Sequence, residues 1–114
     1  MSDLMQWNPD IQSAVIVDDG RALASSAAGE SVIHAAELMA ASATGFFGAT
    51  ARLGLEGVRV TMIDGDEGHA VIARVDDRCL VVVVAAPGAP MSALRADVEW
   101  VASRLVRPAL RRGT

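Results

Sequence analysis

The chain has 114 residues, of which 52% are apolar, 21% are charged and only 4% are aromatic. This length fits a single domain over residues 1–114, and the high apolar content excludes an intrinsically disordered chain. A net charge of −4 gives no general attraction to phosphate groups, so we expect no nucleic-acid partner. The apolar fraction is nevertheless high for so small a domain, which indicates a second buried surface besides the core.

The sequence gives no sign of export or of a membrane anchor. Its start, Met1-Ser2-Asp3-Leu4, lacks the basic and long apolar regions of a signal peptide. The longest strongly apolar run, Cys79 to Ala86, is far shorter than the roughly 20 residues of a membrane span. With one cysteine and no internal disulfide framework, we expect a cytoplasmic protein without a membrane span. All ten basic residues are arginine, which we attribute to coding bias.

The N-terminal part predicts a β-hairpin. A single helical turn is expected over Asp3–Trp7, before a buried strand over Ala14–Val17. Asp18-Asp19-Gly20 follows, and Asp-Gly between apolar runs is the strongest short hairpin signal. The return strand is expected over Ala22–Ser25.

A long helix is predicted from about Glu30 to Leu53, ended by Gly54 and Gly57. Apolar and small residues recur there at helical spacing in two stripes: Val32, Ala36, Met39, Ala43, Phe46 and Thr50, and beside them Ile33, Ala40, Phe47 and Ala51. Charged residues are sparse in this segment. A helix that is apolar almost all round is normally covered on more than one side.

The C-terminal half predicts three strands and a closing helix. The strands are expected over Val58–Ile63, Ala70–Val75 and Leu80–Ala85, and their short acidic connections make an antiparallel meander. The last strand is apolar on both faces, so we expect it at the centre of a sheet covered on both sides. The helix is expected from about Ser92 to Arg107, where Pro108 ends its pattern.

These elements predict an α/β (α+β) fold with a five-stranded antiparallel sheet. If the fifth strand is central, it pairs with the first and the fourth, and the sheet order is 2-1-5-4-3. The long helix then covers one face and the terminal helix or helices cover the other. The second and third strands are the free edges.

Residues that could carry chemistry are few. Cys79 has only His34 and His69 as possible bases, and we interpret it as a small buried apolar residue. His34 and Glu37 lie three apart, as in di-iron helices, but a single such pair is insufficient for that site. The acidic segment from Asp64 to Gly68 lacks the ligand pattern of a calcium loop and is interpreted as a hairpin turn. We therefore expect no catalytic residue, no metal and no cofactor.

Two further features stay open to a binding role. The glycines of Gly45-Phe46-Phe47-Gly48-Ala49-Thr50 lie inside the helix pattern without a following lysine, so they are not a phosphate loop. They allow another helix or backbone to approach closely. Arg59, on the expected edge strand, is either a guard against edge-to-edge aggregation or a rim contact of a paired edge, and we weight these two roles equally.

The order of elements resembles the roadblock/dynein light-chain family, in particular bacterial members found beside Ras-like small GTPases. The segment from Ala14 to Ala24 carries most of the resemblance, supported by Ala35-Ala36 and Leu38, and it extends over about residues 7–110. The family fold is profilin-like or longin-like. A short segment with Pro9 replaces the usual first helix, and Pro87-Gly88-Ala89-Pro90 is stiffer than the usual turn, so the resemblance does not name the partner.

The resemblance implies a non-enzymatic homodimer or heterodimer that regulates or scaffolds a Ras-like small GTPase, in some members by stimulating its GTP hydrolysis. It places the dimer edge on one strand and the helix contacts on the long helix. The implied interface residues are Val58, Arg59, Val60, Thr61, Met62 and Ile63 on the strand and Met39, Ala43, Phe46, Phe47 and Thr50 on the helix.

Two alternatives differ in class. One is a small-molecule-sensing or purely structural interaction domain, although the expected core has almost no buried polar residues to bind a ligand. The other is an enzyme that uses Cys79 with His69.

Overall fold

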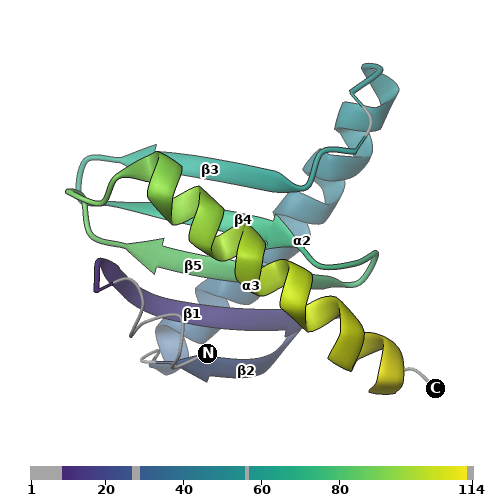
Figure 1. The fold of residues 1–114 in the computed structure, drawn as a ribbon, viewed down its shortest axis with the longest axis horizontal. Coiled ribbons are helices and arrows are strands. Elements are labelled where there is room, and N and C mark those ends of the chain that lie inside the picture. Colours follow the sequence, from purple (N-terminus) through teal and green to yellow (C-terminus); the bar gives the residue numbers. More distant parts are fainter. Residues whose placement is uncertain (1–8, 27–28, 56, 113–114) are drawn as a thin grey trace.

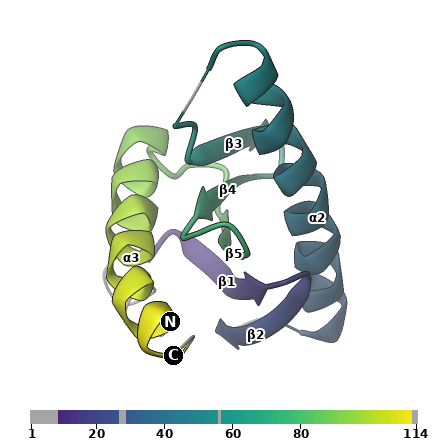
Figure 2. The same cartoon turned by 90° about the vertical axis from the view of Figure 1, so that its right-hand side faces the viewer.

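The computed structural model describes residues 9–26, 29–55 and 57–112, with only the backbone described for 105–112. The described elements are β1 (Ile11–Asp18), β2 (Arg21–Ser26), α2 (Glu30–Arg52), β3 (Val60–Gly65), β4 (Gly68–Arg74), β5 (Cys79–Ala85) and α3 (Met91–Arg112). Figure 1 shows α3 lying across one face of the sheet, with α2 behind it. In Figure 2 the sheet lies between the two helices.

The sheet has five antiparallel strands in the order β2-β1-β5-β4-β3, as the sequence predicts. The central strand is β5, and its residues from Cys79 to Val83 are all buried. Val81 and Val83 pack on the α3 side, whereas Val82 packs on the α2 side. A strand of this kind needs an apolar cover on both faces, and this explains the three layers.

Each helix covers one of the two apolar cores that lie on either face of the sheet. Leu94 and Val98 of α3 are completely buried over the α3 side of the sheet. On the other side Ala36, Ala40 and Phe47 of α2 pack against the sheet. The small alanines let α2 lie close to the strands, and Phe47 fills the remaining space.

The β1–β2 hairpin forms at the predicted turn. Asp19 and Gly20 have φ angles of 52° and 84°, the two positive values of a type I′ turn. A bulge opposite the Ile16–Val17 step follows in β2, where Leu23 is the extra residue. The neighbouring Ala22 N–H donates to Glu37 Oε2 of α2 at 2.7 Å. Glu37 thus fixes α2 to the hairpin.

The end of α2 has a Schellman motif. Gly54 has a φ of 81°, and its N–H donates to the Ala51 carbonyl while the Leu55 N–H donates to the Thr50 carbonyl. Glycine adopts this left-handed conformation without strain, so the predicted stop at Gly54 is confirmed.

The structure differs from the predicted boundaries by one to three residues at most strand ends; β1, for example, begins at Ile11 and not at Ala14. β3 begins at Val60, so Val58 and Arg59 precede the strand that was expected to include them. The prediction that Pro108 ends the last helix is wrong, because α3 continues to Arg112. Proline removes one N–H donor, and the following turn still forms its own hydrogen bonds. The turn expected over Asp3–Trp7 lies outside the described residues.

His69 joins two turns at one end of the sheet. It is 8% exposed, and its Nε2 donates to the Pro87 carbonyl oxygen at 2.8 Å, just before α3. Asp64 Oδ1 lies 2.9 Å from its other ring nitrogen, Nδ1. His69 therefore ties the β3–β4 hairpin to the start of α3.

We predict that His69→Ala lowers the free energy of unfolding by about 1–3 kcal/mol, because a hydrogen bond is lost at a nearly buried site. Chemical denaturation measures the change. His34→Ala is the matched control: its side chain is 74% exposed, so a change within about 0.5 kcal/mol is expected. Equal effects of the two substitutions would contradict this role of His69.

Candidate protein–protein interface

One edge of the sheet presents free backbone groups. β3 is the last strand in the order, and the Arg74 N–H donates to the Arg59 carbonyl at 2.7 Å. Successive residues of an antiparallel strand direct their N–H and C=O groups alternately to one side of the strand and to the other. Thr61 and Ile63 therefore also direct these groups to β4. Val60, Met62 and Asp64 then direct theirs outward, away from the described sheet. This edge has the geometry needed to pair with another strand.

The side chains of β3 include few of the charged residues that hinder pairing at a sheet edge. Val60, Thr61 and Met62 are half-buried, and Ile63 is 44% exposed. The hydroxyl of Thr61 is buried and has no hydrogen-bond partner among the described residues. Asp64 is the one charged residue within β3, and it lies at the strand's end. The central part of the edge is therefore apolar.

The outer face of α2 is also apolar and exposed. Leu38, Phe46 and Leu53 have exposed fractions of 60%, 57% and 77%. Apart from Arg52, the other exposed residues between them are small, and Gly45 and Gly48 have open space where a side chain would lie. Large exposed apolar side chains next to small residues, which let another backbone approach closely, are typical of a surface on which a second helix packs.

The two features lie next to one another. In Figures 1 and 2 the C-terminal turns of α2 extend past β3, beyond the edge of the sheet. By length and composition alone α2 could cross a membrane. Its inner face packs on the sheet, however, and its outer face has no cover from the described residues.

Of the interface residues that the resemblance implied, some are exposed and others are buried in the core. Phe46 points outward, whereas Ala43, Phe47 and Thr50 are buried beneath α2 and Met39 is half-buried there. Of the strand residues, Val58 packs on the α2 side and Arg59 is exposed. Whether these residues touch a partner remains a prediction. Leu38 and Leu53 are exposed as well, and sequence reasoning missed them as contacts because inward and outward positions are equally apolar in this segment.

The residues considered for chemistry lie apart. Cys79 is buried at the start of β5. His34 Nδ1 and Glu37 Oε1 are 4.0 Å apart, and Glu37 is already bonded to the hairpin. The acidic segment forms the β3–β4 turn, as predicted. In the described ranges, no three histidine, cysteine or acidic side chains are grouped so that they could hold a metal ion.

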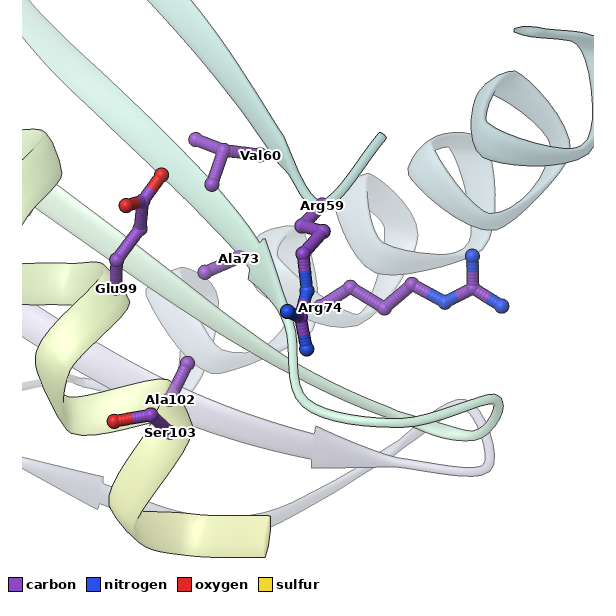
Figure 3. A pocket seen from close by; sticks show the side chains of 7 residues that line it. All are labelled: Arg59, Val60, Ala73, Arg74, Glu99, Ala102 and Ser103. Atoms are coloured by element: carbon purple, nitrogen blue, oxygen red, sulfur yellow. The ribbon is translucent and has the colours of Figure 1, made fainter. Parts of the chain in front are cut away.

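Three open cavities in the described part of the chain are candidates for a small ligand. One, of about 260 Å³, lies between α3 and the β3–β4 pair and is lined by Arg59, Val60, Ala73, Arg74, Glu99, Ala102 and Ser103 (Figure 3). A second, of about 450 Å³, lies between the first half of α2 and strands β1 and β5. A third, of about 380 Å³, is lined by residues 57–59 and 74–77.

The arrangement of elements is the roadblock/LC7 fold, which confirms the resemblance at the level of the fold. A roadblock/LC7 domain from Streptomyces avermitilis aligns with a TM-score of 0.74 and 24% identity over 97% of this chain and 94% of that chain. MglB from Myxococcus xanthus aligns with a TM-score of 0.82 and 15% identity, covering 96% and 90% of the two chains. A structure of MglB with a tetrameric arrangement aligns with a TM-score of 0.79 and 19% identity, covering 93% of this chain and 82% of that chain.

Neither a protein-family model nor a curated protein matches the sequence. The similarity therefore lies in the fold.

We predict opposite outcomes for two adjacent phenylalanines. Phe47→Ala should lower the free energy of unfolding by about 3–5 kcal/mol, because it leaves a cavity beneath α2. Phe46→Ala should change it by no more than about 0.5 kcal/mol at protein concentrations too low for association. Denaturation curves of the two variants measure both values. A large loss for Phe46→Ala in a monomeric sample would contradict its outward position.

Proposed function

We propose that this protein is a homodimer that regulates or scaffolds a Ras-like small GTPase in the cytoplasm, acting by binding and without catalysis of its own. The observation that carries the proposal is the unpaired, apolar β3 edge beside the exposed apolar face of α2. The roadblock/LC7 fold supports it, because the solved structures that share this fold include MglB, one of them in a tetrameric arrangement.

In the proposed dimer, the β3 strands of two copies pair antiparallel about a two-fold axis. With Met62 opposite its own copy, Val60 lies opposite Asp64 of the second copy, and the outward backbone groups of all three residues find partners. Each hydrogen bond contributes about 0.5–1.5 kcal/mol net. The two sheets then form one continuous sheet, and the overhanging ends of α2 meet across the axis.

This arrangement accounts for the apolar surface that a single protomer leaves exposed. Packing the outer faces of two α2 helices covers Phe46 and Leu53. Gly45 and Gly48, which have open space in place of a side chain, let the two helices approach closely. Burial of apolar area stabilises such contacts by roughly 25 cal/mol per Å². The paired helices present a broad surface to which a globular partner can bind.

A small-molecule sensor is the second candidate, and the open cavity of about 450 Å³ beside α2 is the observation that favours it. Ligand cavities have a few convergent polar groups, and here Gln12, Ser13 and Ser31 supply them. A thermal-shift screen with nucleotides and metabolites distinguishes the two functions, because a sensor is stabilised by its ligand and a GTPase scaffold is not.

We predict that Val60→Pro weakens dimerisation, because proline removes an N–H that faces the free edge. The change costs two hydrogen bonds across the axis, which corresponds to roughly a tenfold or greater rise in the dissociation constant. Size-exclusion chromatography with light scattering measures it. Val60→Ala keeps the N–H and is the matched control. Equal dimerisation by both variants would count against strand pairing.

The GTPase part has its own test. Wild-type protein and Phe46→Glu, both immobilised, are exposed to native cytosol and then to purified GTPases loaded with GDP or with a non-hydrolysable GTP analogue. We expect a small GTPase to be retained in one nucleotide state by the wild type. Retention should fall at least about tenfold for Phe46→Glu, since a charge in the apolar contact between the two α2 helices disrupts the paired surface to which the GTPase binds. If no GTPase is retained in either state, this part of the proposal fails while the dimer remains testable.

A further inference from the structure

The charged residues of the chain are unevenly distributed. All fourteen acidic residues lie within residues 1–99, together with six of the ten arginines. Residues 100–114 contain the other four, Arg104, Arg107, Arg111 and Arg112, and no acidic residue. Salt screens charges beyond about 8–10 Å at ordinary ionic strength. The C-terminal half of α3 therefore acts locally as a basic segment, although the net charge of the whole chain is −4.

Three of these arginines share one face of α3 with Trp100. They follow it at intervals of four, three and four residues, the spacing of neighbours on a helix surface. Trp100 is 42% exposed and Arg104 is exposed as well, whereas Leu94 and Val98 on another side of the helix are fully buried against the sheet. The positions of the three arginines thus lie on the face of α3 that is turned away from the sheet.

The charge on this face is not cancelled within α3. The two acidic residues of the helix, Asp97 and Glu99, both precede Trp100, and Glu99 Oε1 already lies 2.9 Å from Arg95 Nε. The Arg104 guanidinium lies 4.5 Å from the centre of the Trp100 ring and makes no ion pair within the described part of the chain. Its charge is therefore available to an anionic partner.

The same segment is amphipathic, which indicates the kind of anion. Its arginines alternate with the apolar residues Val101, Leu105, Val106 and Leu110. In Figure 1 the last turns of α3 extend past the end of β1. A basic amphipathic helix with a tryptophan is typical of a segment that lies on an anionic membrane, where arginines contact lipid head groups and tryptophan lies at their level. A nucleic acid would bind the charge alone, so the apolar residues favour lipid.

The position of α3 suits a flat partner. It covers the face of the sheet opposite α2 (Figure 2). Antiparallel pairing of two β3 strands about a two-fold axis keeps both α3 helices on one face of the joined sheet. Two basic segments would then meet the same membrane surface, while the α2 helices remain turned toward a soluble partner.

We infer that the face of α3 that carries Trp100, Arg104, Arg107 and Arg111 binds the surface of an anionic membrane. The helix lies on the surface and does not cross it. Its arginines bind the anionic groups of the lipids, and Trp100 enters the head-group layer. Each copy binds by itself, so the inference does not rest on the proposed dimer, and pairing of two copies strengthens the attachment because two sites act together.

The test uses the full chain carrying Trp7→Phe, so that Trp100 is the one remaining tryptophan. Phosphatidylcholine vesicles with and without phosphatidylserine are added, and co-sedimentation and Trp100 emission are both recorded. We expect binding to the phosphatidylserine vesicles alone, with a blue shift of the emission and a loss of affinity as salt is raised. A basic residue near such a surface contributes about fivefold, equivalent to about 1 kcal/mol, so Arg104→Ala/Arg107→Ala should weaken binding about 25-fold.

The control is Arg52→Ala/Arg59→Ala, which removes the same charge from two exposed arginines outside α3 and should change the affinity less than about twofold. Arg104→Lys/Arg107→Lys keeps the charge and should keep most of the binding, and circular dichroism verifies that each variant is folded. Equal binding with and without phosphatidylserine, or equal affinities of the two alanine double variants, would overturn the inference. So would tighter binding to hexaglutamate or to duplex DNA than to the vesicles, since the face would then recognise another polyanion. A monomer that binds the vesicles would contradict the dimer and leave this inference intact.

Discussion

The rest of the structure depends on the burial of β5 on both faces. A strand with valines at successive positions presents apolar side chains to both sides of the sheet, so each side requires its own cover. The chain has two helices in its described part for this purpose, and each covers one face. Placing β5 at the centre also determines the edges. The hairpin β1–β2 takes one side and the meander takes the other, which leaves β3 with an unpaired row of backbone groups.

The proposed interactions follow from what this arrangement leaves uncovered. A single helix on a five-stranded sheet buries only one of its faces, and α2 is apolar on the other as well. Burying Phe47 beneath the helix while Phe46 faces outward gives the same apolar segment a role in the core and a role at the surface. The α3 side has a different character, because Arg95 and Glu99 form an ion pair on the surface of α3 and Trp100 is 42% exposed there. The molecule thus has an apolar face suited to pairing with another apolar surface, and a more polar face on the other side of the sheet.

Much of the fold was predictable because its signals are local. The Asp19-Gly20 turn, the alternation of apolar runs with short turns, and Gly54 each predict one feature, and together they give the sheet order. The strand and helix ends were less predictable: β3 starts two residues late, and Pro108 does not stop α3 because proline costs a single donor. The candidate surfaces were only partly predictable. Periodicity does not separate inward from outward positions in a helix with little polar contrast. The cavity near Arg59 forms where α3 packs over the β3–β4 pair, and α3 is distant from both strands in sequence.

The most direct test of the proposed dimer is amide hydrogen exchange along β3, read residue by residue as the protein is diluted. In the protomer the N–H groups of Val60 and Met62 face outward, so they should exchange as rapidly as edge amides do. Pairing with a second copy predicts that both are protected at high protein concentration and lose that protection on dilution. Rapid exchange of Val60 and Met62 at every concentration, equal to that of unpaired amides on β2, would contradict the dimer.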